Sequence, residues 1–368
     1  MTLRKNAVPV PPPHSQPFHG SIQHPDLWLW DSWTYTHQGE ITLFCLALAK
    51  TNRAGAPILP GDRNDYPFHV RRFSSSDGCQ TWRDCGVFIE PDHEPGSSLS
   101  HNVWSGSALN SQDGLLLGLT GIHQPEQTRS FLQTLCYAQT TPGAAITSAQ
   151  IIPFSDPYED YERILAAGYY LGPKDQLGAS SGEDGGPILA WRDPFFVREQ
   201  EGVYRAYWAA KVGPMEPAIG QARLMRTQNG LRVDALLPPI TPPDSDAYTQ
   251  SEVPKVYVNP ADGSALMLTS TCNRIDESQP DSEVSKELRL YAADHLDGRW
   301  APFSPHSAIL PGTEHLFGGE FINVDFANQS AELIAPYTEM ASPELQLTFA
   351  AKRPVSFAIT ARDQAPAA

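Results

Sequence analysis

Charged side chains are scarce in this chain of 368 residues, since Asp, Glu, Lys and Arg together make up 18% of it. An ordinary soluble domain has roughly 25%. Positive charge is the scarcer kind, because 26 Lys and Arg stand against 42 Asp and Glu, which gives a formal net charge of −16. Nucleic acids and anionic lipid surfaces attract proteins of the opposite sign. The composition therefore argues against a nucleic-acid partner and against binding to a membrane surface.

Long apolar runs are also missing. The best one, Ile41–Ala49, is well short of the roughly 20 residues that a membrane-spanning helix needs. The N-terminus, MTLRKNAVPVPPPHSQPF, lacks the run of about 7–15 apolar residues that marks a secretory signal peptide. We therefore expect no membrane partner, and a protein that is either cytoplasmic or exported without an ordinary signal peptide.

The five cysteines lack the spacing of a zinc site. Cys79 and Cys85 stand close enough in sequence to form a bridge, but reduced and buried thiols are expected in a chain without an export signal. No EF-hand run, paired-histidine motif or Gly-rich phosphate loop is present, and Glu183–Asp184 is interpreted as part of a solvated loop. We expect neither a metal nor another cofactor; structural calcium is possible but not indicated.

What the sequence does contain is a repeated pairing of a glycine turn with an apolar, β-favouring run. Such runs occupy residues 41–49, 115–121, 203–210, 264–270 and 299–303, each just after a glycine. This pattern is typical of hairpins and strands. A helical pattern is confined to Asp160–Ala167. The sequence therefore predicts an all-β fold of many short strands, as in a propeller, a large sandwich or a barrel of several sheets.

The domain organisation follows from the spacing of the strands. A propeller blade uses about 40–50 residues, which would allow six or seven small blades. We interpret residues 84–107 and 158–186 as loops, and this favours five blades with long connections. The expected organisation is a Pro-rich N-terminal arm over residues 1–20, one five-bladed β-propeller over residues 21–358 and a loose tail over residues 359–368.

Three acidic residues stand in aromatic or apolar surroundings: Asp31 in LWLWDSWTY, Asp193 in AWRDPFFV and Glu252 in YTQSEVPKVYV. Each alone is more simply structural, because a buried carboxylate needs a partner; Asp31 could start a turn, and Arg192 could pair with Asp193. Together they suit glycoside cleavage, which needs two carboxyl groups at the anomeric carbon. A third carboxylate can stabilise the positive charge that develops there.

Four short motifs also follow one another in the order in which a known enzyme family has them. WDSW at residues 30–33 resembles VWDSW, and VWSGSA at residues 103–108 resembles EWSGSA. RDP stands at residues 192–194, and QSEVP at residues 250–254 is similar to DEIERP. LIAPYTEM, with Tyr337, resembles a late active-site tyrosine segment. Over residues 26–340 the chain thus resembles glycoside hydrolase family 68, the family of levansucrases and bacterial β-fructofuranosidases.

This resemblance implies a five-bladed β-propeller with the active site in its central funnel. It also implies a retaining enzyme that cleaves sucrose or a related fructoside and passes the fructosyl unit to water or another sugar. Asp31 would be the nucleophile, Glu252 the acid/base and Asp193 the stabiliser of the transition state. The substrate-binding residues carried over are Trp30, Trp104, Ser105, Arg192, Gln250 and Tyr337. Retention implies that the two reacting carboxyl groups are about 5–5.5 Å apart.

The chain departs from the family on the leaving-group side. Val253 stands where the family usually has Arg, Gln250 where it has an acid, and Cys272 near a usual Arg or His for which Arg274 could substitute. The preferred donor, and the balance of hydrolysis against transfer, are therefore open. Two alternatives are an inverting arabinanase- or xylosidase-type propeller, with carboxyl groups about 6.5–9.5 Å apart, and a non-catalytic sugar-binding propeller. The sequence predicts no oligomeric state.

Overall fold

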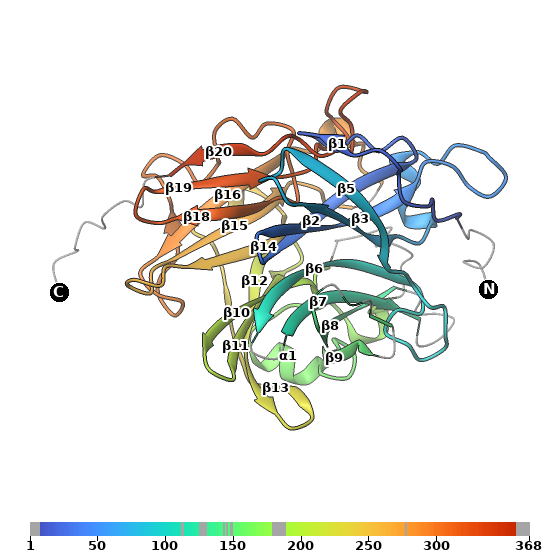
Figure 1. The fold of residues 1–368 in the computed structure, drawn as a ribbon. Coiled ribbons are helices and arrows are strands. Elements are labelled where there is room, and N and C mark those ends of the chain that lie inside the picture. Colours follow the sequence, from blue (N-terminus) through green and yellow to red (C-terminus); the bar gives the residue numbers. More distant parts are fainter. Residues whose placement is uncertain are drawn as a thin grey trace, which may run out of the picture.

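The structure is a computed structural model that describes residues 8–111, 114–124, 131–142, 144, 146–147, 150–178, 189–276 and 278–357. Within these ranges the chain is mainly β-structure, arranged as five antiparallel sheets (Figure 1). The first sheet has the order β1-β5-β4-β3-β2. Its strands are β1 (Phe18–His19), β2 (Leu27–His37), β3 (Glu40–Ala49), β4 (His69–Ser75) and β5 (Thr81–Ile89).

The other four sheets follow one another along the chain, each in sequence order. The second contains β6 (Asn102–Ser111), β7 (Gly114–His123), β8 (Leu132–Thr140) and β9 (Ile152–Ser155). The third contains β10 (Arg192–Gln200), β11 (Val203–Gly213), β12 (Glu216–Thr227) and β13 (Gly230–Ile240). The fourth contains β14 (Gln250–Val258), β15 (Ala265–Cys272), β16 (Lys286–Ala293) and β17 (Ala301–Pro302). The fifth contains β18 (Glu320–Asp325), β19 (Ser330–Ile334) and β20 (Arg353–Ser356).

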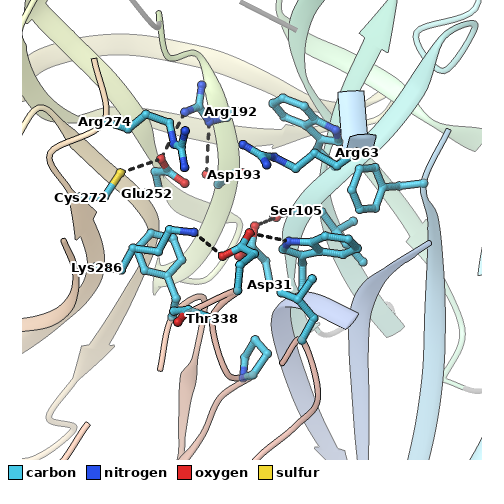
Figure 2. A pocket seen from close by; sticks show the side chains of 18 of the residues that line it. Asp31, Arg63, Ser105, Arg192, Asp193, Glu252, Cys272, Arg274, Lys286 and Thr338 are labelled. Atoms are coloured by element: carbon cyan, nitrogen blue, oxygen red, sulfur yellow. Dashed lines mark hydrogen bonds and ion pairs between the residues drawn. The ribbon is translucent and has the colours of Figure 1, made fainter. Parts of the chain in front are cut away.

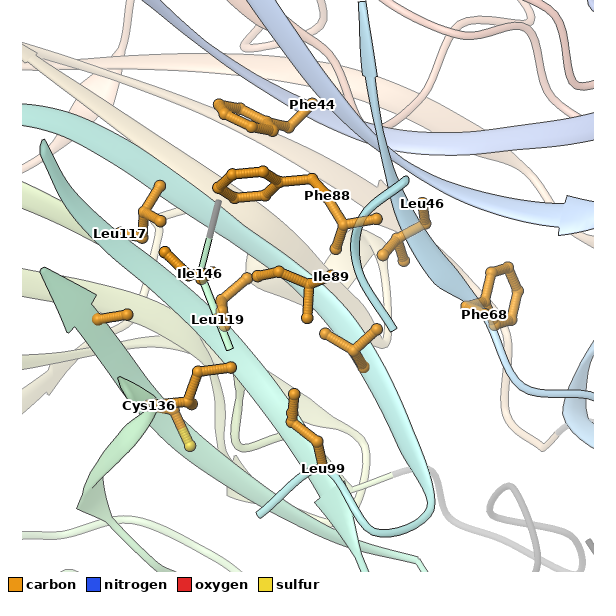
Figure 3. Packing of buried hydrophobic residues seen from close by; sticks show 14 of the residues in the cluster. Phe44, Leu46, Phe68, Phe88, Ile89, Leu99, Leu117, Leu119, Cys136 and Ile146 are labelled. Carbon is orange, nitrogen blue, oxygen red and sulfur yellow. The ribbon is translucent and has the colours of Figure 1, made fainter. Parts of the chain in front are cut away.

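The sheets form a five-bladed β-propeller. The first long strand of each sheet, namely β2, β6, β10, β14 or β18, lies nearest the axis, and these inner strands contact those of neighbouring blades. Five separate apolar clusters fill the spaces between adjacent blades. Figure 3 shows the cluster between the first and second blades, where Phe44 and Phe88 pack near Leu117 and Leu119. The predicted fold class is confirmed.

Packing on both faces explains why the strands are continuous apolar runs. In β3, nine consecutive residues after Glu40 are buried, as expected for a strand covered on both sides. The hairpin before it was also predicted: Gln38 and Gly39 form the two-residue loop between β2 and β3, both with positive φ, at 50° and 83°. That is the conformation of a tight hairpin turn. The predicted helix is present as α1 (Tyr161–Ala166).

Two local predictions were wrong. Residues 84–107 are not one loop, since β5 and β6 occupy both its ends. Asp84 is tolerated inside β5 because the Arg71 guanidinium donates to it. The run at 299–303 forms only the two-residue strand β17. The other stretch expected as a loop, 158–186, holds α1 and one short 3-10 turn, Lys174–Gln176, within its described residues 158–178. Glu183–Asp184 lies outside the described residues.

The N-terminal segment is anchored to the first blade. Arg71 is fully buried and donates hydrogen bonds to the carbonyl oxygens of Pro11 and Pro12, at 2.7 and 2.9 Å. The His14 amide donates to Asp84 at 2.7 Å, and β1 pairs with β5. Within the described part of the arm, residues 8–19 are therefore held against the propeller by a buried ion pair and a short strand.

The first and fifth blades meet where the ring closes. Ile22 forms an isolated β-bridge with Phe349, and the Leu29 amide donates to the Leu347 carbonyl at 3.0 Å. The Ser32 amide and hydroxyl both donate to the carbonyl of Gly318, at 2.8 and 3.1 Å. An apolar cluster also joins the first and fifth blades. The ring is thus closed by backbone hydrogen bonds and by packing between its first and last blades.

All five cysteines are free thiols, so Cys79 and Cys85 do not bridge. Cys85 is partly exposed, and the other four are buried. Among the described residues, no helix combines the length and the apolar character that crossing a membrane requires.

Candidate active site

One pocket gathers most of the predicted site residues (Figure 2). Its empty volume is about 940 Å³, counting the open space at its mouth. The three predicted acids Asp31, Asp193 and Glu252 all line it. So do five of the predicted substrate-binding residues: Trp30, Trp104, Ser105, Arg192 and Tyr337. The pocket wall therefore combines carboxylates, cations and aromatic rings.

Irregular strand pairing places these residues. The inner strands of four blades each shift register at the predicted motif: between Leu29 and Ser32 in β2, Trp104 and Gly106 in β6, Arg192 and Phe195 in β10, and Glu252 and Lys255 in β14. A β-bulge of this kind re-aims a side chain. Asp31, Ser105 and Asp193 lie inside such bulges, and Glu252 immediately precedes one. The motifs of the sequence are therefore the points where the inner strands turn side chains into the pocket.

Asp31 lies between Ser105 and Gly318. The Ser105 hydroxyl donates a 2.7 Å hydrogen bond to Asp31 Oδ2. Gly318, with a φ of +61°, approaches so closely that a Cβ there would lie 2.2 Å from Asp31 Oδ1. Burial raises the pKa of Asp31, and the charge of Glu252 adds to this, while Ser105, Lys255 and Arg192 oppose it. Asp31 therefore holds its proton more strongly than an exposed aspartate does.

Asp193 is held by backbone groups in unusual conformations. Both Asp193 and Val253 have positive φ, at 65° and 49°, which is rare for non-glycine residues and a clear outlier for a β-branched one. These conformations let the Asp193 amide donate to the Thr120 hydroxyl at 2.7 Å and the Val253 amide donate to Asp193 Oδ2 at 3.1 Å. Burial also raises the pKa of Asp193, against the opposing charge of Arg192.

Glu252 is the most accessible partner of Arg192. Its side chain is 21% exposed, whereas that of Asp193 is 4% exposed. Arg192 Nη2 lies 3.5 Å from Glu252 Oε1, and its Nε lies 4.0 Å from Asp193 Oδ2. Figure 2 shows Arg192 between these two acids. A single guanidinium therefore links them, and only Glu252 has ready access to solvent protons.

The opposite wall of the pocket contains close ion pairs. Lys286 pairs with Glu339, which also accepts a 3.3 Å hydrogen bond from Trp30 Nε1. Burial alone would raise the pKa of Glu339, but Lys286 and Arg63 lower it to about 2. Arg274 pairs with Asp281. Glu339 also holds the pKa of Lys286 above its ordinary value, so this pair stays charged over the whole physiological pH range.

Gln250 is the one predicted substrate-binding residue that does not line the pocket. It is buried behind Arg274, and its side-chain amide donates to the Arg274 carbonyl at 3.3 Å. Val253 is buried as well and contributes its backbone amide rather than its side chain. Cys272 does line the pocket, with its sulfur 3.9 Å from Glu252 Oε1. Arg274 also lines it, as the sequence left open.

Sequence reasoning missed several residues of this site. Lys286, Glu339 and Arg63 line the pocket, and Gly318 touches Asp31. Glu339 stands in the LIAPYTEM segment two residues after Tyr337 but was not singled out, and the other three stand in no recognisable motif. Lys255 is different, because a lysine inside the apolar strand sequence VPKVYV is a visible signal of a buried charge. Among the described residues, no group of three or more His, Cys, Asp or Glu side chains is placed to hold a metal ion. The absence of a cofactor stays a prediction.

Known proteins share the fold at low sequence identity. No protein-family model and no curated protein sequence matches the chain. A crystal structure of Bacillus subtilis levansucrase is 15% identical, covering 92% of this chain and 87% of its own, with a TM-score of 0.59. A levansucrase variant complexed with sucrose is 14% identical, with coverages of 94% and 88% and a TM-score of 0.59. A variant of B. megaterium levansucrase is 16% identical, with coverages of 93% and 88% and a TM-score of 0.61. At this identity the likeness establishes the propeller fold.

Proposed function

We propose that this protein is a retaining enzyme that acts on β-fructofuranosides, either sucrose or a related fructoside. The observation that carries the proposal is the meeting of Asp31, Asp193 and Glu252, from the inner strands of three blades, in one pocket with Trp30 and Trp104. The shared fold of levansucrases, one of them complexed with sucrose and another with oligosaccharides, supports the same substrate class.

The first step of the proposed reaction forms a covalent intermediate. A carboxylate oxygen of Asp31 attacks C2 of the fructosyl unit while the bond from C2 to the leaving-group oxygen breaks. Glu252 gives its proton to that oxygen, so the leaving sugar departs neutral. Ser105 orients the nucleophile through its 2.7 Å hydrogen bond.

The second step regenerates the enzyme. Glu252, now a carboxylate, takes a proton from water or from a sugar hydroxyl, and the resulting oxygen attacks C2. The bond between C2 and Asp31 breaks, and Asp31 leaves as a carboxylate. Asp193 would hydrogen-bond fructosyl hydroxyls and stabilise the oxocarbenium-like charge. Arg192, Tyr337 and the rings of Trp30 and Trp104 would bind the sugar.

The residues on the leaving-group side of the pocket differ from those usual in the family, and they would determine which donor binds best. Gln250 and Val253 both point away from any direct grip on the leaving sugar. Arg274, Lys286 and Glu339 would bind it instead. The proposal therefore includes fructosides other than sucrose as donors.

The test is to incubate the purified protein with sucrose and a panel of other fructosides, following glucose, fructose and oligosaccharides separately. Equal glucose and fructose from sucrose would identify a hydrolase, and excess glucose a fructosyltransferase. Asp31→Ala should reduce turnover at least about 1,000-fold while circular dichroism and thermal unfolding stay near those of the unaltered protein. Unchanged turnover in a folded Asp31→Ala protein would refute the assignment.

A further inference from the structure

Two buried charged residues lie further along the inner strands, outside the wall of the pocket. Lys255 is on β14, three residues after Glu252, and Glu320 is on β18, two residues after Gly318. They are 1% and 6% exposed. Burying a charge is costly unless other charges or hydrogen bonds compensate it. Neither residue belongs to a motif used above, so their place near the axis needs its own account.

The surroundings of Lys255 come from all the other inner strands. Its Nζ donates to the Gly106 carbonyl of β6 at 3.1 Å and lies 5.4 Å from the centre of the Phe195 ring of β10. The charges that act on it belong to Glu320 of β18, Asp193 of β10 and Asp31 of β2. Lys255 Nζ gives this hydrogen bond to a neutral carbonyl, and its positive charge acts on these three carboxyl groups together.

The ionisation of both residues is finely balanced. Burial lowers the pKa of Lys255, while Glu320, Asp193 and Asp31 oppose that shift. Burial raises the pKa of Glu320 to about 7, against Lys255 and against the Thr34 amide, which donates to Glu320 Oε2 at 2.6 Å. Around neutral pH, Glu320 can thus supply or withdraw a negative charge beside Lys255.

We propose that Lys255 is a positioning residue that favours the ionised form of Asp31, since its Nζ donates to the Gly106 carbonyl, next to the Ser105 hydroxyl that donates to Asp31. The catalytic meaning of this inference rests on the proposed function. An aspartate must be a carboxylate to attack, yet partial burial and the charge of Glu252 raise the pKa of Asp31. Arg192 faces Glu252 and Asp193, so Lys255 supplies the second positive charge that three neighbouring carboxyl groups require.

The electrostatic direction is definite. Removing a positive charge near a carboxyl group makes its ionised form less favourable and raises its pKa. Lys255→Met should therefore raise the pKa of Asp31 by about one unit or more, and the acidic limb of kcat/KM should move to higher pH by the same amount. The value of kcat should therefore fall about twofold at pH 7 and about fivefold at pH 6, with little change in KM. Lys255→Arg should restore most of the pH profile.

The experiment measures the Asp31 titration directly and does not depend on turnover. Protein labelled with 13C at aspartate and glutamate side-chain carboxyl groups is titrated by NMR, and Asp31→Asn assigns the signal. The variants are Lys255→Met, Lys255→Arg and Glu320→Gln. Lys211→Met is the matched control, because Lys211 is equally buried but donates to the carbonyls of Thr249 and Pro214.

The expected pattern is specific to a charge effect. Lys255→Met raises the Asp31 pKa, whereas Glu320→Gln leaves it within about 0.3 units or lowers it, because Glu320 is already largely protonated where Asp31 titrates. Lys211→Met lowers thermal stability without moving the titration. An unmoved Asp31 signal in Lys255→Met, or an equal upward shift in Glu320→Gln, would overturn the inference.

Two outcomes separate this inference from the proposed function. If Lys255→Met does not fold, Glu320→Gln still tests the inference, because an upward shift of the Asp31 pKa there contradicts it. If the unaltered protein cleaves no fructoside while the titrations follow the pattern, the charge network stands and the substrate assignment fails.

Discussion

Two regions of the pocket differ in how closely their charged groups are paired: the floor, formed by Asp31 and Asp193, and the opposite wall, which contains Lys286 and Glu339. On the floor, Asp31 is partly exposed and Asp193 is buried, and both have raised pKa values. Arg192 lies no closer than 3.5 Å to either acid that it faces. On the wall, Glu339 is in close contact with Lys286, and its pKa is lowered to about 2. In the proposed reaction the floor acids act at the reacting carbon, whereas the charged pair on the wall would only bind the leaving sugar. The proposed function thus assigns chemistry to the floor and selection of the donor to the wall.

The largest effect expected is on the floor, at Gly318. Any Cβ there meets Asp31 Oδ1 at 2.2 Å and the Asp31 Cα at 2.8 Å, so Gly318→Ala must displace the nucleophile. A shift of about 1 Å can reduce the rate roughly 100-fold. We expect at least that loss in kcat for the best fructoside found, measured at saturating substrate.

Gly312→Ala is the matched control for this substitution. Gly312 also has positive φ, at +74°, but nothing lies within 4 Å of the position of its Cβ. It should lose a similar amount of stability from backbone strain, about 1 kcal/mol, and keep its activity. Equal activity of the two variants would show that the floor tolerates movement of Asp31.

An intermediate effect is expected on the wall. Glu339→Gln removes the negative charge that pairs with Lys286 and leaves an amide oxygen that can still accept from Trp30 Nε1. The KM for the donor should rise about tenfold, equivalent to roughly 1.4 kcal/mol, with a smaller change in kcat. Initial rates over a range of donor concentrations measure both constants.

The control is Glu332→Gln, which breaks the more exposed pair of Glu332 with Lys352. It should leave both constants unchanged, since exposed pairs contribute little. A fall in kcat without a change in KM for Glu339→Gln would remove the distinction between floor and wall.

The smallest effect concerns stability and pH. Asp31, Asp193 and Glu320 have raised pKa values in the folded protein, so the folded state binds their protons more tightly than the unfolded state does. Their contribution to stability is fully present below about pH 4 and is lost as pH rises through the folded pKa values. Asp31→Asn should therefore raise Tm by about 1–3 °C at pH 8 and by less at pH 5. Thermal unfolding at the two pH values tests this, and a larger gain at pH 5 would contradict it.

The fold and the acids of the site could be predicted because their signals are local. Glycine turns before apolar runs mark hairpins, and Asp31, Asp193 and Glu252 each stand in a short motif. The strand at residues 84–89 was missed because Asp84 looks like a loop residue until Arg71 is seen to pair with it. A local sequence pattern does not show which side chains of different strands form ion pairs.

The remaining parts of the site depend on how the blades are arranged around the axis. Lys286 lies on β16 of the fourth blade, whereas its partner Glu339 lies between β19 and β20 of the fifth blade. Gly318 reaches Asp31 only through ring closure. Gln250 was expected at the substrate because of its place in a motif, but the register of β14 turns it toward Arg274. The spacing of residues along the sequence does not show how the blades are placed relative to one another.

Ring closure has a consequence for how the protein is made. Ser32, next to Asp31, is hydrogen-bonded to Gly318, which lies 286 residues later in the chain. A ribosome must therefore release nearly the entire chain before the second residue of the WDSW motif has its final neighbours. A nascent or truncated chain that lacks the last blade leaves Asp31 without this support, so the proposed chemistry begins only when synthesis is nearly complete.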